Sequence, residues 1–131
     1  MTSHKQALID LRDKVKAGEF ERPDSEGGSP KFNAFMNCAE AAFGAYGPFA
    51  KARIAWEAYR GSLDAAKALH EAVLPGWGWH IRQDEKDGSC HAHTLYPNYR
   101  VSPGGVCLEG DPARAWLLAI LEALIDQEGD T

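Results

Sequence analysis

Three histidines with a spacing that could serve metal chemistry fall in one short segment: His80, His91 and His93. Residues 77–82 alternate apolar and polar side chains, a pattern typical of a strand with one buried face. Asp87-Gly88 predicts a turn, because glycine adopts the positive φ that such turns need at little cost. Residues 89–96 would then return as a second strand, so we expect an antiparallel β-hairpin that carries all three histidines.

The register of this hairpin decides which side chains share a face. A connection with an even number of residues sets odd-numbered positions opposite even-numbered ones, and a change of one residue would invert the pairing. The even case predicts an apolar face that joins Trp77, Trp79 and Ile81 to Cys90, Ala92 and Thr94. It predicts a polar face that carries His80, Arg82, His91 and His93. We expect Trp79 at the centre of the apolar face, and therefore buried.

Three imidazoles on one face of a hairpin can present nitrogen atoms to a single Zn²⁺, as three-histidine catalytic zinc sites do. One hypothesis for function is therefore a small metal-dependent enzyme that uses His80, His91 and His93. The competing interpretation is a polar face in contact with water or covered by a helix, because no acidic residue is placed to orient a metal-bound imidazole.

A second group of residues combines aromatic rings with positive charge: Tyr96, Tyr99 and Arg100, with Arg82 across the sheet. Rings and guanidinium planes can stack on a base while arginine pairs with a phosphate, so these residues predict a ligand site for a nucleotide. The alternative is an ordinary exposed strand edge.

The remaining candidates for chemistry favour structural roles. Cys38, Cys90 and Cys107 are an odd number with no CxxC spacing, which is typical of reduced, buried cysteines. Gly104-Gly105 lacks the lysine and the strand-loop-helix context of a phosphate loop, so we interpret it as a hairpin turn between short strands at 99–101 and 106–109. We expect no catalytic residue and no cofactor.

Helical patterns surround the predicted sheet of three to four strands. They cover residues 3–16, a second helix from 32 to about 44–47, a third that ends at Tyr59, a fourth that Ser62 caps, and a long apolar helix that Asp111-Pro112 opens. Residues 18–31 read as a mobile loop. The fold class is therefore α+β, with the sheet packed between helices as in an α/β/α sandwich.

Five aromatic residues mark the helices between residues 32 and 59: Phe35, Phe43, Phe49, Trp56 and Tyr59. Aromatic stripes at helical spacing usually pack inward, so one interpretation is a hydrophobic core. The other is a self-association interface, because one small sheet offers little surface for two such helices to cover. The second interpretation predicts a homo-oligomer.

Three segments of the C-terminal half together resemble the phage ABA sandwich domain of small phage and prophage proteins: residues 62–66, the sequence Pro75-Gly76-Trp77-Gly78-Trp79, and Pro112-Ala113 with the helix that follows. The resemblance implies a sheet between helical layers and a phage or prophage origin, and it carries no catalytic residue. The helical half, residues 1–60, departs from the family's short form, whereas residues 61–128 would form the sandwich-like half of a single domain spanning 1–131.

Composition narrows the function classes. The formal net charge of −5 argues against binding to a DNA or RNA backbone, which needs a basic patch. No signal peptide, membrane-spanning segment or lipidation motif is evident, so we expect a protein of the bacterial host cytoplasm. We therefore favour a non-enzymatic, phage-type accessory binding protein. It would antagonise a bacterial defence system by binding a host protein or by sequestering a nucleotide signal.

Overall fold

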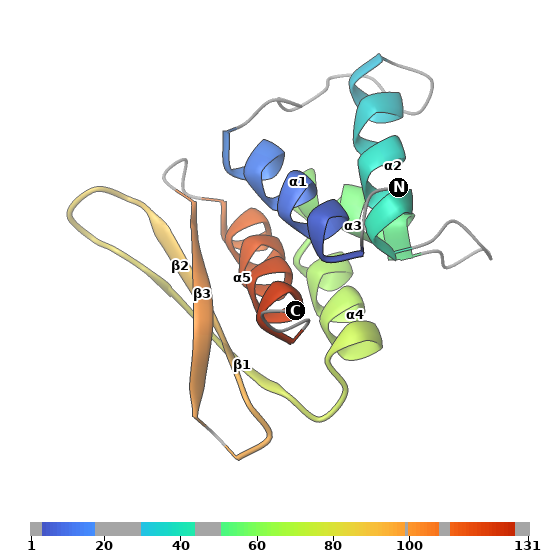
Figure 1. Ribbon diagram of the computed structural model, residues 1–131. Helices are drawn as coiled ribbons and strands as arrows, with labels where there is room; N and C mark the ends of the chain where they lie inside the picture. Colours follow the sequence, from blue (N-terminus) through green and yellow to red (C-terminus); the bar gives the residue numbers. More distant parts are fainter. Residues whose placement is uncertain (1–3, 18–29, 44–50, 99, 108–110, 128–131) are drawn as a thin grey trace.

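The computed structural model describes residues 4–17, 30–43, 51–98, 100–107 and 111–127. Five helices and one sheet make an α+β fold, which confirms the predicted class (Figure 1). In chain order the elements are α1 (His4–Ala17), α2 (Pro30–Phe43), α3 (Lys51–Tyr59), α4 (Leu63–Val73), β1 (Gly78–Gln83), β2 (Cys90–Leu95), β3 (Val101–Cys107) and α5 (Pro112–Gln127). The predicted mobile loop falls on residues 18–29, outside the described residues, and α2 begins at Pro30, two residues earlier than expected.

Two helices begin at the capping residues that the sequence predicts. The Ser62 hydroxyl oxygen accepts a hydrogen bond from the Ala65 backbone N–H at 3.1 Å, which satisfies an otherwise unpaired donor in the first turn of α4. A carboxylate oxygen of Asp111 accepts from the Arg114 N–H at 3.1 Å at the start of α5. Pro112 follows at the first helical position, where a missing N–H costs nothing.

The sheet has strand order β1-β2-β3 and is antiparallel throughout. Its first hairpin adopts the predicted register, since Trp79 lies opposite Thr94 and His80 opposite His93. Gly88 adopts a φ of +74° in the connecting turn, and the Asp84 N–H donates to the Ser89 carbonyl oxygen at 2.8 Å. The turn that the sequence predicts therefore sets the pairing of the two strands.

The prediction of a hairpin turn at Gly104-Gly105 is wrong. Both glycines lie within β3, where Gly105 is opposite Ala92 and Gly104 is opposite His93. The register shifts between His93 and Leu95, so that Ser102 and Pro103 both fall opposite Thr94 in a β-bulge. An edge strand tolerates a proline and a bulge because one side of its backbone needs no partner.

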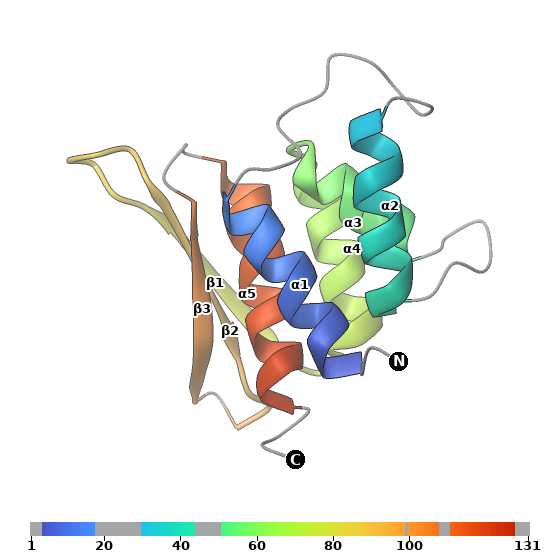
Figure 2. The same cartoon turned by 45° about the horizontal axis from the view of Figure 1, so that its top comes forward.

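The layers differ from the predicted sandwich in their order. Helix α5, rather than the sheet, occupies the middle: it packs on β2 and β3 on one side and on α1, α3 and α4 on the other (Figures 1 and 2). Among the described residues no helix covers the opposite face of the sheet. Helix α5 is thus covered on two sides, and every one of its residues from Ala113 to Leu121 is buried.

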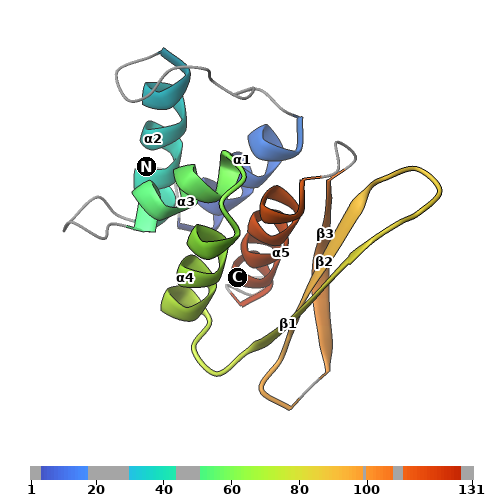
Figure 3. The same cartoon turned by 180° about the vertical axis from the view of Figure 1, so that it is seen from behind.

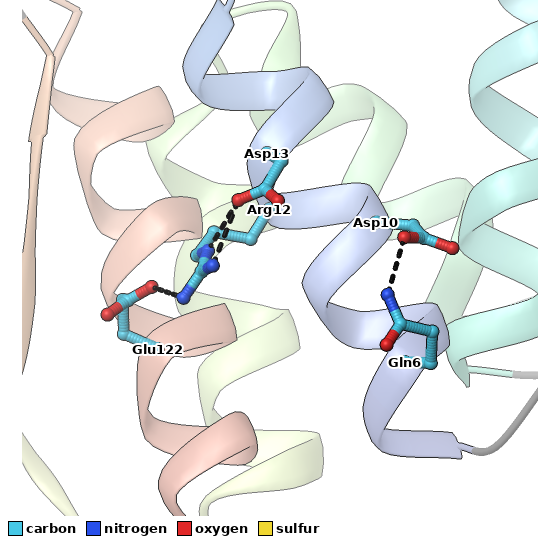
Figure 4. Close-up of polar contacts among 5 residues, drawn as sticks. All are labelled: Gln6, Asp10, Arg12, Asp13 and Glu122. Carbon is cyan, nitrogen blue, oxygen red and sulfur yellow. Dashed lines mark hydrogen bonds and ion pairs between the residues drawn. The ribbon is translucent and has the colours of Figure 1, made fainter.

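Helix α1 is tied to α5 by an ion pair as well as by apolar packing. The Arg12 guanidinium donates to Glu122 of α5 at 2.7 Å and also contacts Asp13, whose carboxylate lies 2.9 Å away (Figure 4). Gln6 and Asp10 form a second contact along α1, at 2.9 Å. Leu8, Leu11 and Val15 are buried on the inward side of the same helix.

In the part of the chain that the structure describes, no helix has the length and apolar character of a membrane span.

The aromatic residues of α2 and α3 form a core cluster within one chain. Phe35, Trp56 and Tyr59 are 0–1% exposed, and the ring centroids of Phe35 and Trp56 lie 5.2 Å apart. The interpretation of these three rings as a self-association interface is therefore wrong: α2 and α3 pack against each other and so cover the stripes that the sequence left unassigned. Phe43 is half-buried against the same core, and Phe49 lies outside the described residues.

Candidate binding surface on the uncovered face of the sheet

The side chains of β1 and β2 divide between two faces of the sheet, as their alternation predicts. Cys90, Ala92 and Thr94 point toward α5 and are at most 3% exposed. The other set lies on the uncovered face, where the strands pair His80 with His93 and Arg82 with His91. Figure 3 shows the sheet with every helix on one side of it. The hairpin therefore presents three imidazoles and one guanidinium away from the body of the molecule.

The turn beside this face is ordered by short hydrogen bonds. Ser89 is buried, and its hydroxyl oxygen lies 3.1 Å from Nε2 of His91. The Ser89 N–H donates to Asp87 at 2.9 Å, and hydrogen bonds from the Ser89 side chain and backbone lower the pKa of the Asp87 carboxyl group. Asp87 therefore stays ionised and holds the turn, and the His91 ring is oriented from one side.

No acidic side chain lies on this face within β1 or β2. The register places Gly78, His80 and Arg82 on it from β1, and His91, His93 and Leu95 from β2. Arg82 and His80 are exposed, and an imidazole can donate a hydrogen bond in either protonation state. In a chain with a formal charge of −5, the face thus supplies donors and a positive charge, which suit an acidic partner.

The three-histidine metal site is not assembled in this structure. His80, His91 and His93 share one face as predicted, yet the described residues contain no group of three His, Cys, Asp or Glu side chains that could hold one metal ion. His91 instead contacts Ser89, and Nδ1 of His93 is buried with no hydrogen-bond partner among the described residues. The geometry gives no support to the metal-dependent enzyme.

The predicted nucleotide-binding residues are not brought together. Tyr96 lies beyond the end of β2, where its ring contacts Trp77 with centroids 4.7 Å apart. Its hydroxyl donates to Asp126 of α5 at 2.6 Å, and this hydrogen bond raises the pKa of Tyr96. Arg100 lies near it, because the Tyr96 N–H donates to the Arg100 carbonyl oxygen at 2.8 Å. Arg82 is on the opposite face of the sheet and at the other end of β1.

Tyr99, the fourth residue of that predicted site, lies outside the described residues. The aromatic ring of Tyr96 is also committed to α5 and Trp77, so it does not offer an open stacking surface beside Arg82. The structure therefore supports a polar face at the hairpin and not a pocket that combines all four residues.

Sequence reasoning missed His70, a residue of α4 that contacts both α5 and the segment before β1. Its side chain is fully buried; Nδ1 accepts a hydrogen bond from the Trp116 indole N–H at 3.2 Å, and Nε2 lies 3.0 Å from the Trp77 carbonyl oxygen. An indole nitrogen only donates, so the ring proton must be on Nε2. Burial lowers the pKa of His70, which keeps the ring neutral. Its spacing of four residues from the inward-facing Ala66 was the available signal.

A cleft lies between α1 and α2, away from the sheet. It has a volume of about 220 Å³ and is lined by Ala7, Asp10, Lys14, Asn37, Cys38 and Ala41. Charges of both signs and small side chains line it, with no aromatic ring or arginine to hold a nucleotide. It therefore suggests no particular ligand.

Comparisons of this chain with protein-family models, with curated proteins and with solved structures found no match.

Proposed function

We propose that this protein is a non-enzymatic binding protein that presents the uncovered face of its sheet to an acidic surface of another protein. The observation that carries the proposal is the hairpin face of His80, Arg82, His91 and His93, which no helix of the described residues covers and to which β1 and β2 contribute no acidic side chain. A sheet packed on one side only usually carries polar residues on the other. Here those residues are hydrogen-bond donors, and Arg82 is positively charged, which supports recognition of an acidic partner.

A protein partner fits this face better than a free nucleotide. Small ligands need a concave site that covers most of their surface, whereas protein partners are bound on flat surfaces. Arg82 and Tyr96, which were expected to clamp a base and a phosphate together, lie on different faces. We therefore favour an acidic protein over a nucleotide signal as the binding partner.

The phage-type part of the proposal rests on the resemblance of residues 62–66, 75–79 and 112–121 to the phage ABA sandwich domain. Small accessory proteins of that kind suggest a role in the host cytoplasm, where occupying a host protein could antagonise a bacterial defence system. Self-association through Phe35, Trp56 and Tyr59 is no part of the proposal, because the core of one chain already buries these rings.

The test compares two charge reversals of equal size. Arg82→Glu reverses the positive charge on the proposed face, and Lys51→Glu makes the same change at an exposed position at the start of α3. Each full-length variant is immobilised and exposed to bacterial lysate, and captured proteins are quantified by mass spectrometry. We expect a protein that the unmodified chain and Lys51→Glu retain and that Arg82→Glu captures at least about tenfold less, because a like charge would face its acidic surface.

Circular dichroism and the urea midpoint establish that both variants are folded. If no protein is captured by the unmodified chain above background, or if Arg82→Glu captures the same proteins in the same amounts, the proposed function is wrong.

A further inference from the structure

Strand β1 leaves one edge of its backbone unpaired. The hydrogen bond from the Asp84 N–H to the Ser89 carbonyl oxygen fixes the alternation of the β1-β2 ladder, so that the N–H and C=O groups of His80 and Arg82 point toward β2. The same groups of Trp79, Ile81 and Gln83 point away from it. No group of the described residues pairs with these three backbone positions.

The two edges of the sheet differ in how they are protected. Natural sheets guard their edges with prolines, bulges and charges, because an open edge is a template for another strand. The β3 edge has Pro103, two glycines and a bulge opposite Thr94. Strand β1 contains no proline and pairs with β2 without a bulge over residues 78–83. Only β1 therefore offers a regular edge within the described sheet.

An exposed apolar side chain, that of Trp79, lies beside this open edge on the helix side. Trp79 is 39% exposed and is one of the two large exposed hydrophobic residues, with Leu63, among those that the structure describes. Lys67, one turn after Leu63 on α4, holds its ammonium group 6.0 Å from the centre of the Trp79 ring. On the other side of the same edge lie His80 and Arg82, both exposed.

We infer that an extended segment of the partner protein adds to β1 as a fourth strand and that this segment alternates acidic and apolar residues. The inference rests on the proposed function and names the part of the partner that binds. Apolar side chains of the added strand would cover Trp79 and Ile81 on the helix side, and acidic ones would meet His80 and Arg82 on the uncovered face, because neighbouring strands place opposite residues on the same side. Main-chain hydrogen bonds to Trp79, Ile81 and Gln83 would supply affinity, as in other strand-addition complexes.

Charge complementarity selects this occupant over a second copy of the chain. Two-fold antiparallel pairing of β1 with itself about His80, Ile81 or Arg82 would set Arg82 opposite Gly78, His80 or Arg82 of the second chain, respectively. None of these is acidic, so Arg82 would gain no opposite charge in any of the three arrangements. Both copies would also carry the same formal charge of −5.

The experiment uses the full chain labelled with ¹⁵N and the synthetic peptide acetyl-Glu-Val-Glu-Val-Glu-Val-Glu-amide as the probe. Amide hydrogen exchange is followed with and without the peptide. We expect the free chain to protect the N–H groups of His80 and Arg82 and to leave those of Trp79, Ile81 and Gln83 unprotected. The peptide should slow exchange of the latter three by at least about tenfold, because each becomes hydrogen-bonded.

Matched peptides test the chemistry of the added strand. A version with lysine in place of glutamate should not bind, because it would oppose Arg82 with like charge. A third version carries N-methyl groups on the valine backbone nitrogens, on the edge of the peptide that would face β1. It should bind with at least about tenfold lower affinity, because those nitrogens can no longer donate hydrogen bonds to β1. Equal binding of all three peptides overturns the inference.

A pair of substitutions tests the edge from the side of the protein. Gln83→Pro removes one outward N–H at an exposed position and leaves the β2 ladder intact, whereas Gln83→Ala shortens the same side chain and keeps the N–H. We expect Gln83→Pro to weaken peptide binding at least about tenfold and Gln83→Ala to change it less than about twofold. Similar affinities for the two variants overturn the inference.

Three further outcomes also count against the added strand. Peptide-induced shifts confined to His80, Arg82, His91 and His93, with no new protection at the edge, would overturn the inference and leave the proposed function standing. Protection of the edge that rises with protein concentration in the absence of peptide would identify a second copy as the occupant. Absence of binding by the acidic peptide overturns the inference, while the capture experiment with Arg82→Glu still decides the proposed function.

Discussion

At the scale of single residues, His70 joins three parts of the molecule with one side chain. It belongs to α4, shares hydrogen bonds with Trp116 of α5 and with the Trp77 carbonyl oxygen before β1, and meets the Trp79 ring edge-on with centroids 5.1 Å apart. Both ring nitrogens are used only in the neutral form with the proton on Nε2. Protonation of Nδ1 would place a donor against the Trp116 N–H, so the arrangement is sensitive to acid.

We predict that the chain loses stability as the pH falls below about 6.5, the ordinary pKa of histidine. Burial lowers the pKa of His70 in the folded state, so in this range the unfolded chain binds a proton that the folded chain does not. The free energy of unfolding therefore rises with pH between the folded pKa and about 6.5, and levels off above it. Urea denaturation at pH 5.5 and pH 7.5 measures the difference.

The control for this pH dependence is a histidine at the surface. His70→Phe should cost about 2–3 kcal/mol at pH 7.5, because it leaves the Trp116 N–H and the Trp77 carbonyl oxygen without partners, and it should remove most of the loss at pH 5.5. His80→Gln, which removes an exposed histidine and leaves the two hydrogen bonds of His70 in place, is the matched control variant. An unchanged acid loss in His70→Phe would show that another group controls it.

At the scale of elements, the cover that α5 gives to the sheet is uneven. It packs closely on β3 and β2 and reaches β1 only at its margin. Trp116 of α5 is 4% exposed, whereas Trp79 of β1 is 39% exposed although the two rings are in contact, with centroids 5.1 Å apart. The expectation that Trp79 is a central, buried residue is therefore wrong: its face is correct, but its strand is at the edge of the sheet.

This difference predicts unequal costs for two tryptophan substitutions. Trp116→Ala should destabilise the chain by about 3–5 kcal/mol, the usual range for removing a large buried ring. Trp79→Ala should cost about 2 kcal/mol, because a part of that ring already contacts water in the folded chain. The urea midpoints of the two variants, compared at an equal dependence of the unfolding free energy on urea, give the ratio of the two losses in stability. A cost for Trp79→Ala as large as that for Trp116→Ala would show that the β1 edge is covered in solution.

Local patterns predicted most of the elements, and the failures have local causes too. The caps at Ser62 and Asp111 and the hairpin register depend on short-range hydrogen bonds, so the sequence was sufficient for them. The course of β3 was missed because Gly104-Gly105 has the composition of a turn. Its pairing with Ala92 and His93 depends on an edge position that only the whole sheet defines.

The same distinction between local patterns and the whole sheet applies to the candidate site. That His80, Arg82, His91 and His93 share a face followed from strand periodicity and the turn, and the structure confirms it. Whether that face is covered depends on the order of the layers, which no pattern within the hairpin encodes. Helix α5 is apolar around most of its circumference, which is typical of a helix covered on two sides but does not tell which element lies in the middle.

At the scale of the whole molecule, α5 is the element that both halves of the chain share. The sheet covers one side of it, and α1, α3 and α4 cover the other. The inward side of α1, with Leu8, Leu11 and Val15, belongs to the N-terminal half, residues 1–60. Residues 61–128 therefore contain α4 but lack α1 and α3, which supply the rest of the cover on the second side of α5.

We predict that a fragment of residues 61–131 does not fold by itself into a stable monomer. Without α1 and α3, the part of α5 that α4 does not cover would be exposed to water on the side turned away from the sheet, and the fragment would lose apolar burial that offsets the entropy of ordering the chain. Its far-ultraviolet circular dichroism should change gradually with urea, without the sigmoidal transition of the full chain. Addition of a peptide of residues 1–60 should restore that transition, because it returns Leu8, Leu11 and Tyr59 to the core. A fragment that unfolds cooperatively on its own would instead make residues 61–131 an independent domain, with the N-terminal helices an addition to it.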